Sequence, residues 1–153
     1  FRRVLFRSPT HDKRLNYHML WSDPLYFVTG TLSPLAQKMN VTLEQLANYP
    51  AILPAANTFT SQITLAEFAK HNLKPYATMS TNPLESIRML VSVGLGWSVL
   101  PQTLINQDLQ PVNMDKPLEL QRYLGVVTNP NITISASMAA LLDMLGLKLT
   151  PRD

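Results

Sequence analysis

The stretch that decides the fold is NPLESIRMLVSVGLGWSVLP, residues 82–101. Its first half predicts a helix with Asn82 as N-cap, Pro83 at the first helical position and Glu85 placed to reach back to the cap. Apolar residues recur at helical spacing and give this helix one buried face: Leu84, Ile87, Leu90 and Val91. We therefore expect an amphipathic helix that packs on a sheet.

A glycine turn and a strand complete this stretch. Gly94 follows the last periodic residue, where helices commonly end in a left-handed conformation. Residues 97–100 (WSVL) then predict a buried strand closed by Pro101, with Trp97 in the core. Gly94 and Gly96 do not form a Rossmann phosphate loop, because they follow a helix and precede a strand.

Strands and helices also alternate before this stretch. Residues 25–29 (LYFVT) predict a buried strand, and Thr42 opens a short helix at the start of a capping-box pattern. Residues 51–53 (AIL) predict a second strand, after which a helix runs to Asn72 and residues 76–80 predict a third strand.

A strand and a helix follow towards the end of the chain. Residues 122–128 (RYLGVVT) predict a strand, and Ser135 is placed to cap a last helix that ends at Gly146. That helix is expected to pack through Met138, Leu141, Leu142 and Leu145. The alternation as a whole predicts an α/β fold with a mainly parallel sheet.

The charge of the chain is concentrated near its start. There are 13 Lys and Arg against 10 Asp and Glu among the 153 residues, and Arg2, Arg3 and Arg7 account for the excess. Because the remainder is neutral, no basic face is predicted, and binding of nucleic acid by this domain is not supported. Nothing approaches the apolar length of a membrane span, and no apolar segment follows the basic start as in a signal peptide.

Enzyme chemistry has no positive signal. The sequence holds no Cys, no GxSxG nucleophile motif and no HExxH metal motif. The three histidines and the acidic residues are scattered over different predicted elements. We predict that the domain is not an enzyme and uses no metal or cofactor.

Runs rich in small polar residues precede two of the predicted helices. These are Asn57, Thr58, Phe59, Thr60 and Ser61 before one helix, and Thr81 and Asn82 before the other. Helix N-termini offer free N–H groups to anions, and ligands of open α/β sheets bind at the carboxyl edge of the strands. The alternative is that Thr60 or Ser61, together with Asn82, merely cap helices.

Five segments in the same order resemble the effector-binding domain of LysR-type transcription regulators, over about residues 15 to 146. The segments are LWSDPLYFV (20–28), SPLA (33–36), LEQLANYP with ILP (43–54), the stretch at 82–101, and LGVV (124–127). The segment at 82–101 is similar to the family's LVxxGLGxxxLP block. Ser33 replaces the histidine that is usual in the family's HPLA turn.

The resemblance implies the two-lobed fold of type 2 periplasmic-binding proteins, with the second lobe essentially complete and the first partial. Residues 20–122 would form the second lobe, 9–19 a remnant of the first lobe or its crossover, and 123–147 the return to the first lobe. Residues 1–8 are expected to be a non-native or disordered leader, and 148–153 a tail.

In that family a small effector, such as an organic anion or an amino acid, binds between the lobes and changes oligomer packing and promoter binding. Thr58, Thr60 and Ser61 would hydrogen-bond the effector, while Thr81 and Asn82 would shape the opposite wall. The resemblance also implies a homodimer or homotetramer in the cytoplasm. DNA would be bound only through a winged helix-turn-helix that this chain lacks.

Two other functions stay open. One is a periplasmic solute-binding protein of a transporter, which has similar lobes, although the polar residues 9–18 count against a signal peptide. The other is a non-catalytic part of an α/β enzyme, which a pocket holding a histidine or carboxylate of shifted pKa would support.

Overall fold

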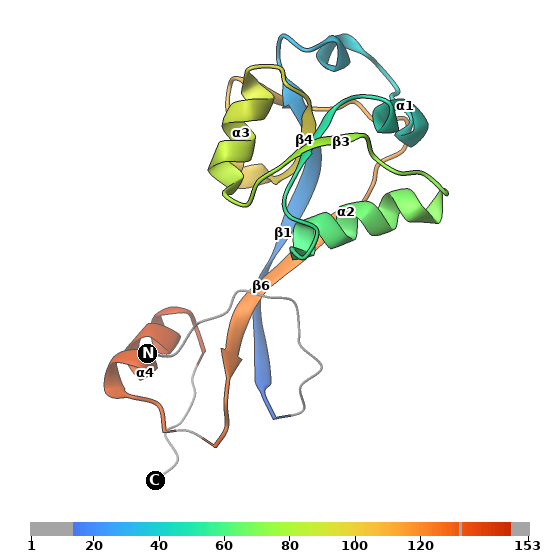
Figure 1. Ribbon diagram of the computed structural model, residues 1–153. Helices are drawn as coiled ribbons and strands as arrows, with labels where there is room; N and C mark the ends of the chain where they lie inside the picture. The colour runs from blue at the N-terminus through green and yellow to red at the C-terminus, as the bar shows by residue number, and fades with distance from the viewer. Residues whose placement is uncertain (1–13, 132, 148–153) are drawn as a thin grey trace. The chain divides into compact units, whose positions relative to one another are not determined.

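The computed structural model describes residues 14–131 and 133–147, so the expected leader (1–8) and tail (148–153) lie outside the described residues. Figure 1 shows the elements in chain order. They are β1 (Asn16–Gly30), η1 (Pro34–Gln37), α1 (Leu43–Ala47), β2 (Ala51–Leu53), α2 (Phe59–Lys70), β3 (Ala77–Ser80), α3 (Leu84–Ser92), β4 (Trp97–Pro101), η2 (Gln102–Leu104), β5 (Leu109–Pro111), β6 (Leu120–Thr128) and α4 (Ala136–Met144).

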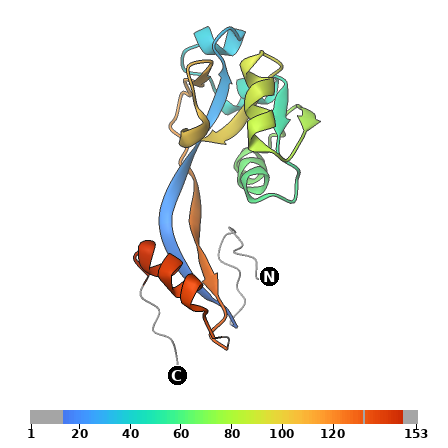
Figure 2. The same cartoon turned by 90° about the vertical axis from the view of Figure 1, so that its left-hand side faces the viewer.

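The chain divides into two compact units. Unit 2 comprises residues 23–122, and unit 1 comprises the residues before 23 and after 122. Strands β1 and β6 each have residues in both units, and Figures 1 and 2 show these two strands side by side.

The sheet is mixed, so the prediction of a mainly parallel sheet is wrong. Its strand order is β3-β2-β4-β1-β5, with β6 paired to β1. Strand β2 runs parallel to β3 and β4, as alternation with helices predicts, but β1 runs antiparallel to β4 and β5. An apolar run marks β1 as a buried strand without specifying its direction, which its partners far along the chain determine.

The two longest helices of unit 2 pack against different hydrophobic clusters. Phe68 of α2 lies in one cluster with Ala51 and Leu53 of β2, whereas Ile87 of α3 lies in a second cluster with Ile52 of β2. Successive side chains of a strand point to opposite faces of a sheet. Helices α2 and α3 therefore cover opposite faces, with β2 buried between them.

An aromatic group holds α2 on its face of the sheet. Trp97 stacks on Phe68 with ring centroids 5.7 Å apart, and Phe27 meets the Trp97 ring edge-on at 5.5 Å. The indole N–H of Trp97 donates to the carbonyl of Tyr49 at 3.1 Å, so its one polar atom is satisfied. The prediction that Trp97 is a core residue is confirmed.

Most of the predicted helix ends are confirmed. Thr42 and Gln45 form the capping box of α1, and Ser135 caps α4 by accepting from the amide of Met138. The three expected C-terminal residues have positive φ: Asn72 (57°), Gly94 (84°) and Gly146 (76°). Of the four residues through which the last helix was expected to pack, only Leu142 is buried.

The prediction that Asn82 caps α3 is wrong. Helix α3 begins at Leu84 with Pro83 as N-cap, and no side chain caps it. The Oδ1 atom of Asn82 instead accepts a hydrogen bond from the backbone N–H of Ala55 at 3.1 Å. That partner lies 27 positions earlier, so the local pattern could not reveal it.

Gly30 allows β1 to approach helix α3 closely. A Cβ atom on Gly30 would lie 2.6 Å from the carbonyl oxygen of Val91 and 3.0 Å from that of Ser92. Both obstacles are backbone atoms, so no side-chain rotation relieves the overlap. This glycine therefore sets the distance between α3 and the sheet.

Replacing Gly30 by Ala should lower the free energy of unfolding by about 3 kcal/mol, because strand and helix must separate. Gly94→Ala is the matched comparison, since its Cβ would have open space and only the positive φ opposes it. We expect a cost of about 1–2 kcal/mol there. Urea unfolding of both variants measures the difference, and a smaller loss for Gly30→Ala would contradict the close approach.

Replacing Asn82 by Ala should lower the free energy of unfolding by about 1–2 kcal/mol, because the amide of Ala55 loses its acceptor. Asn82→Asp keeps an acceptor oxygen and should retain most of the stability. Thermal unfolding measures both variants. If Asn82→Asp lost as much as Asn82→Ala, the hydrogen bond to Ala55 would not be the reason.

Candidate functional site

The structure brings together the two polar loops that the sequence singles out. They follow β2 and β3, which are neighbouring parallel strands and therefore end at the same edge of the sheet. The amide of Thr81 donates to the carbonyl of Leu53 at 3.2 Å, and Asn82 accepts from the amide of Ala55. Ala55 links the loops through its backbone alone, so no side chain could have signalled its role.

Thr58 is the N-cap of α2. Its hydroxyl accepts from the amide of Ser61 at 3.3 Å and donates to the carbonyl of Ala55 at 2.8 Å. Capping by Thr60 or Ser61, the alternative raised by the sequence, is therefore wrong. Because the Thr58 hydroxyl already serves two backbone groups, its first role is to hold the loop and the start of the helix.

The next two residues are buried, and their hydroxyls have no such task. Thr60 is 6% exposed and Ser61 is 2% exposed. Within residues 14–131 and 133–147, neither hydroxyl makes a hydrogen bond. The fully enclosed side-chain oxygens without a partner in the described residues are those of Thr29 and Ser98, so the hydroxyls of Thr60 and Ser61 keep some access to solvent. These two side chains can accept or donate to a molecule bound at this edge.

Backbone N–H groups add to the same region. The amides of Phe59 and Thr60, at the first two positions of α2, have no acceptor among the described residues. Helix α3 also begins without a side-chain cap, which leaves the N–H groups of its first turn unpaired in the described part of the chain. Helix N-termini of this kind favour negatively charged groups.

The remaining predicted residues surround these groups. Phe59 and Thr81 are half-buried, and Asn57 and Asn82 are exposed. Helix α2 leaves β2 towards one face of the sheet, and α3 leaves β3 towards the other. Neighbouring strands whose connections diverge in this way form the switch point where ligands of open α/β sheets bind.

Two other features are absent from the described residues. Within 14–131 and 133–147, no three His, Asp or Glu side chains come together as they would to hold a metal ion. Over the same residues, no helix is both long and apolar enough to cross a membrane.

The chain was compared with known proteins. A family model described as the LysR substrate binding domain matches residues 4–149. The HTH-type transcriptional activator CmpR of Synechocystis is 27% identical over 144 residues, which cover 90% of this chain and 47% of CmpR. The HTH-type transcriptional regulator CatR of Pseudomonas putida is 34% identical over 127 residues, which cover 76% of this chain and 44% of CatR. The chain thus spans about half the length of these relatives.

Solved structures show the same fold. The regulatory domain of CcmR from Synechocystis, in complex with 2-PG, superposes with a TM-score of 0.78 at 24% identity, covering 90% of this chain and 68% of that one. The effector binding domain of QuiR with shikimate gives a TM-score of 0.75 at 21% identity, covering 90% and 67%. These matches confirm the predicted periplasmic-binding-protein-like α/β fold, and the named relatives are regulators. The chain belongs to the LysR substrate binding domain family.

Proposed function

We propose that this chain is the part of a LysR-type regulator that binds its effector, and that the carboxyl edge of β2 and β3 supplies one side of the effector site. One observation carries the proposal. Thr60 and Ser61 are buried residues whose hydroxyls have no protein partner among the described residues, and they lie at the start of a helix whose first amides are also unpaired. A bound effector would satisfy all of these groups together.

The proposed effector is a small organic anion. Its negative group would accept from the amides of Phe59 and Thr60 at the N-terminus of α2, where the helix dipole favours negative charge. The Thr60 and Ser61 hydroxyls would bond its oxygens, and Thr81 with Asn82 would shape the opposite wall. Asn57 and Thr58 would act through the loop, because the hydroxyl of Thr58 is already bonded. Both domains named above were solved with small molecules, 2-PG and shikimate.

The rest of the proposal concerns the whole regulator. Residues 20–122 would be the second lobe, 9–19 a remnant of the first lobe or its crossover, and 123–147 the return to the first lobe. Effector binding would alter the packing of a homodimer or homotetramer and thereby its hold on a promoter. DNA would be bound through a winged helix-turn-helix elsewhere in the polypeptide, in the cytoplasm. The relatives, all named as transcriptional regulators, favour this function over solute capture for transport.

The test begins with the effector. Thermal unfolding of the regulator against a panel of small carboxylates, with shikimate and 2-PG included, should find one that raises the midpoint, because a ligand of the folded state stabilises it. A footprint of the promoter should then change when that compound is added. A regulator whose footprint never responds to any compound that stabilises it would contradict the proposal.

Thr60→Val and Ser61→Ala should each weaken that compound's binding about fivefold to tenfold, the loss of about one hydrogen bond. The midpoint without ligand should stay near that of the parent, because neither hydroxyl has a protein partner. Titration calorimetry measures the affinity.

Two further variants act as controls. Thr58→Ala removes the helix cap and should cost about 1 kcal/mol of stability. Gln62→Ala changes an exposed residue of the same turn and should alter neither stability nor affinity. Unchanged affinity in both Thr60→Val and Ser61→Ala would place the effector elsewhere.

A further inference from the structure

An ion pair within unit 2 joins the first and the last residue of that unit. The Oδ2 atom of Asp23 lies 2.6 Å from both the Nε and an Nη atom of Arg122. The Asp23 side chain is 8% exposed and that of Arg122 is 21% exposed. The two residues are 99 positions apart, so the pair closes unit 2 where its chain begins and ends.

The position of this pair coincides with the boundary between the units. The chain enters unit 2 at the peptide bond between Ser22 and Asp23, and it leaves at the bond between Arg122 and Tyr123. The first passage belongs to β1 and the second to β6. The ion pair joins these two passages.

Near Asp23, two prolines limit the backbone N–H groups that can join β1 to β4. Pro24 follows Asp23 and has no N–H to donate. The next residue, Leu25, is paired in register with Pro101 of β4, which has no N–H either. The side chains of Asp23 and Arg122 therefore attach β1 to β6 at a point where two prolines limit the backbone hydrogen bonds between β1 and β4.

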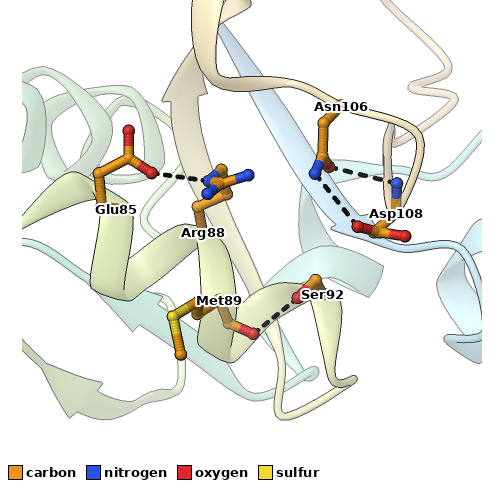
Figure 3. A network of polar contacts seen from close by, with 6 residues as sticks. All are labelled: Glu85, Arg88, Met89, Ser92, Asn106 and Asp108. Carbon is orange, nitrogen blue, oxygen red and sulfur yellow. Dashed lines mark hydrogen bonds and ion pairs between the residues drawn. The ribbon is translucent and has the colours of Figure 1, made fainter.

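The other ion pairs differ in kind. Two further ion pairs, Glu67–Lys70 and Glu85–Arg88, each join residues three positions apart on one helix. Figure 3 shows Glu85 and Arg88 on α3. Their side chains are 65% and 33% exposed. Exposed pairs of this kind contribute little, whereas removing one partner of a largely buried pair leaves the other charge unpaired.

We propose that the Asp23–Arg122 pair is an electrostatic clasp that keeps the two strand passages closed and so sets how stiffly unit 1 is attached to unit 2. Asp23 and Arg122 act through the two strands that they join, as positioning residues. Neither residue belongs to the loops after β2 and β3 that form the proposed effector site.

Hydrogen exchange on the intact regulator, without any ligand, tests the clasp. Asp23→Asn keeps the shape of the side chain and removes its charge. Amides of residues 19–25 and 120–126 should then exchange at least about tenfold faster, while those of β2 and α3 change less than about twofold. Arg122→Lys keeps the charge but lacks the planar fork, and it should give the same local pattern at smaller amplitude.

Glu85→Gln is the matched control, since it removes an exposed ion pair of the same chemistry and should leave exchange unchanged in both regions. Uniformly faster exchange across unit 2 would show a role in overall stability and overturn the clasp. If Asp23→Asn failed to fold, faster exchange in all elements of Arg122→Lys would lead to the same conclusion. Unchanged exchange at both passages would overturn it as well. None of these outcomes depends on whether an effector binds.

Discussion

The three residues of β2 are the constraint on which unit 2 depends. Ala51, Ile52 and Leu53 are buried, lie between β3 and β4, and send their side chains alternately into the two hydrophobic clusters. A strand that is covered on both faces and paired on both edges has little freedom to shift, because a slip of one residue would exchange its two faces. Helices α2 and α3 are placed by this strand, and so are the loops that lead into them.

The proposed effector site follows from that arrangement. Parallel strands end at one edge, and because α2 and α3 lie on opposite faces of the sheet, two helix N-termini begin near each other there. The backbone bonds that join the loops, through Leu53 and Ala55, use no residue with a distinctive side chain. The topology therefore determines where the site lies, and the side chains of the two loops determine which ligand it can bind.

Local signals in the sequence were sufficient for much of this fold. Thr42, Gly94 and Ser135 act within a few residues of their own position, and the structure agrees with each prediction. Features that depend on distant partners were missed. The direction of β1 in the sheet, the bond from Asn82 to Ala55, and the pair of Asp23 with Arg122 all join segments far apart in the chain. Asp23 is one of several scattered carboxylates in the sequence, and only the pairing of strands reveals its partner.

The separation of the cap from the free hydroxyls has an evolutionary consequence. Because Thr58 alone completes the first turn of α2, the residues two and three positions later are released from any structural duty that their hydroxyls could perform. Substitutions of similar volume at positions 60 and 61 can therefore change the polar groups offered to a ligand while the cap of the helix stays in place. A domain built in this way can diversify its chemical preference while its scaffold stays the same.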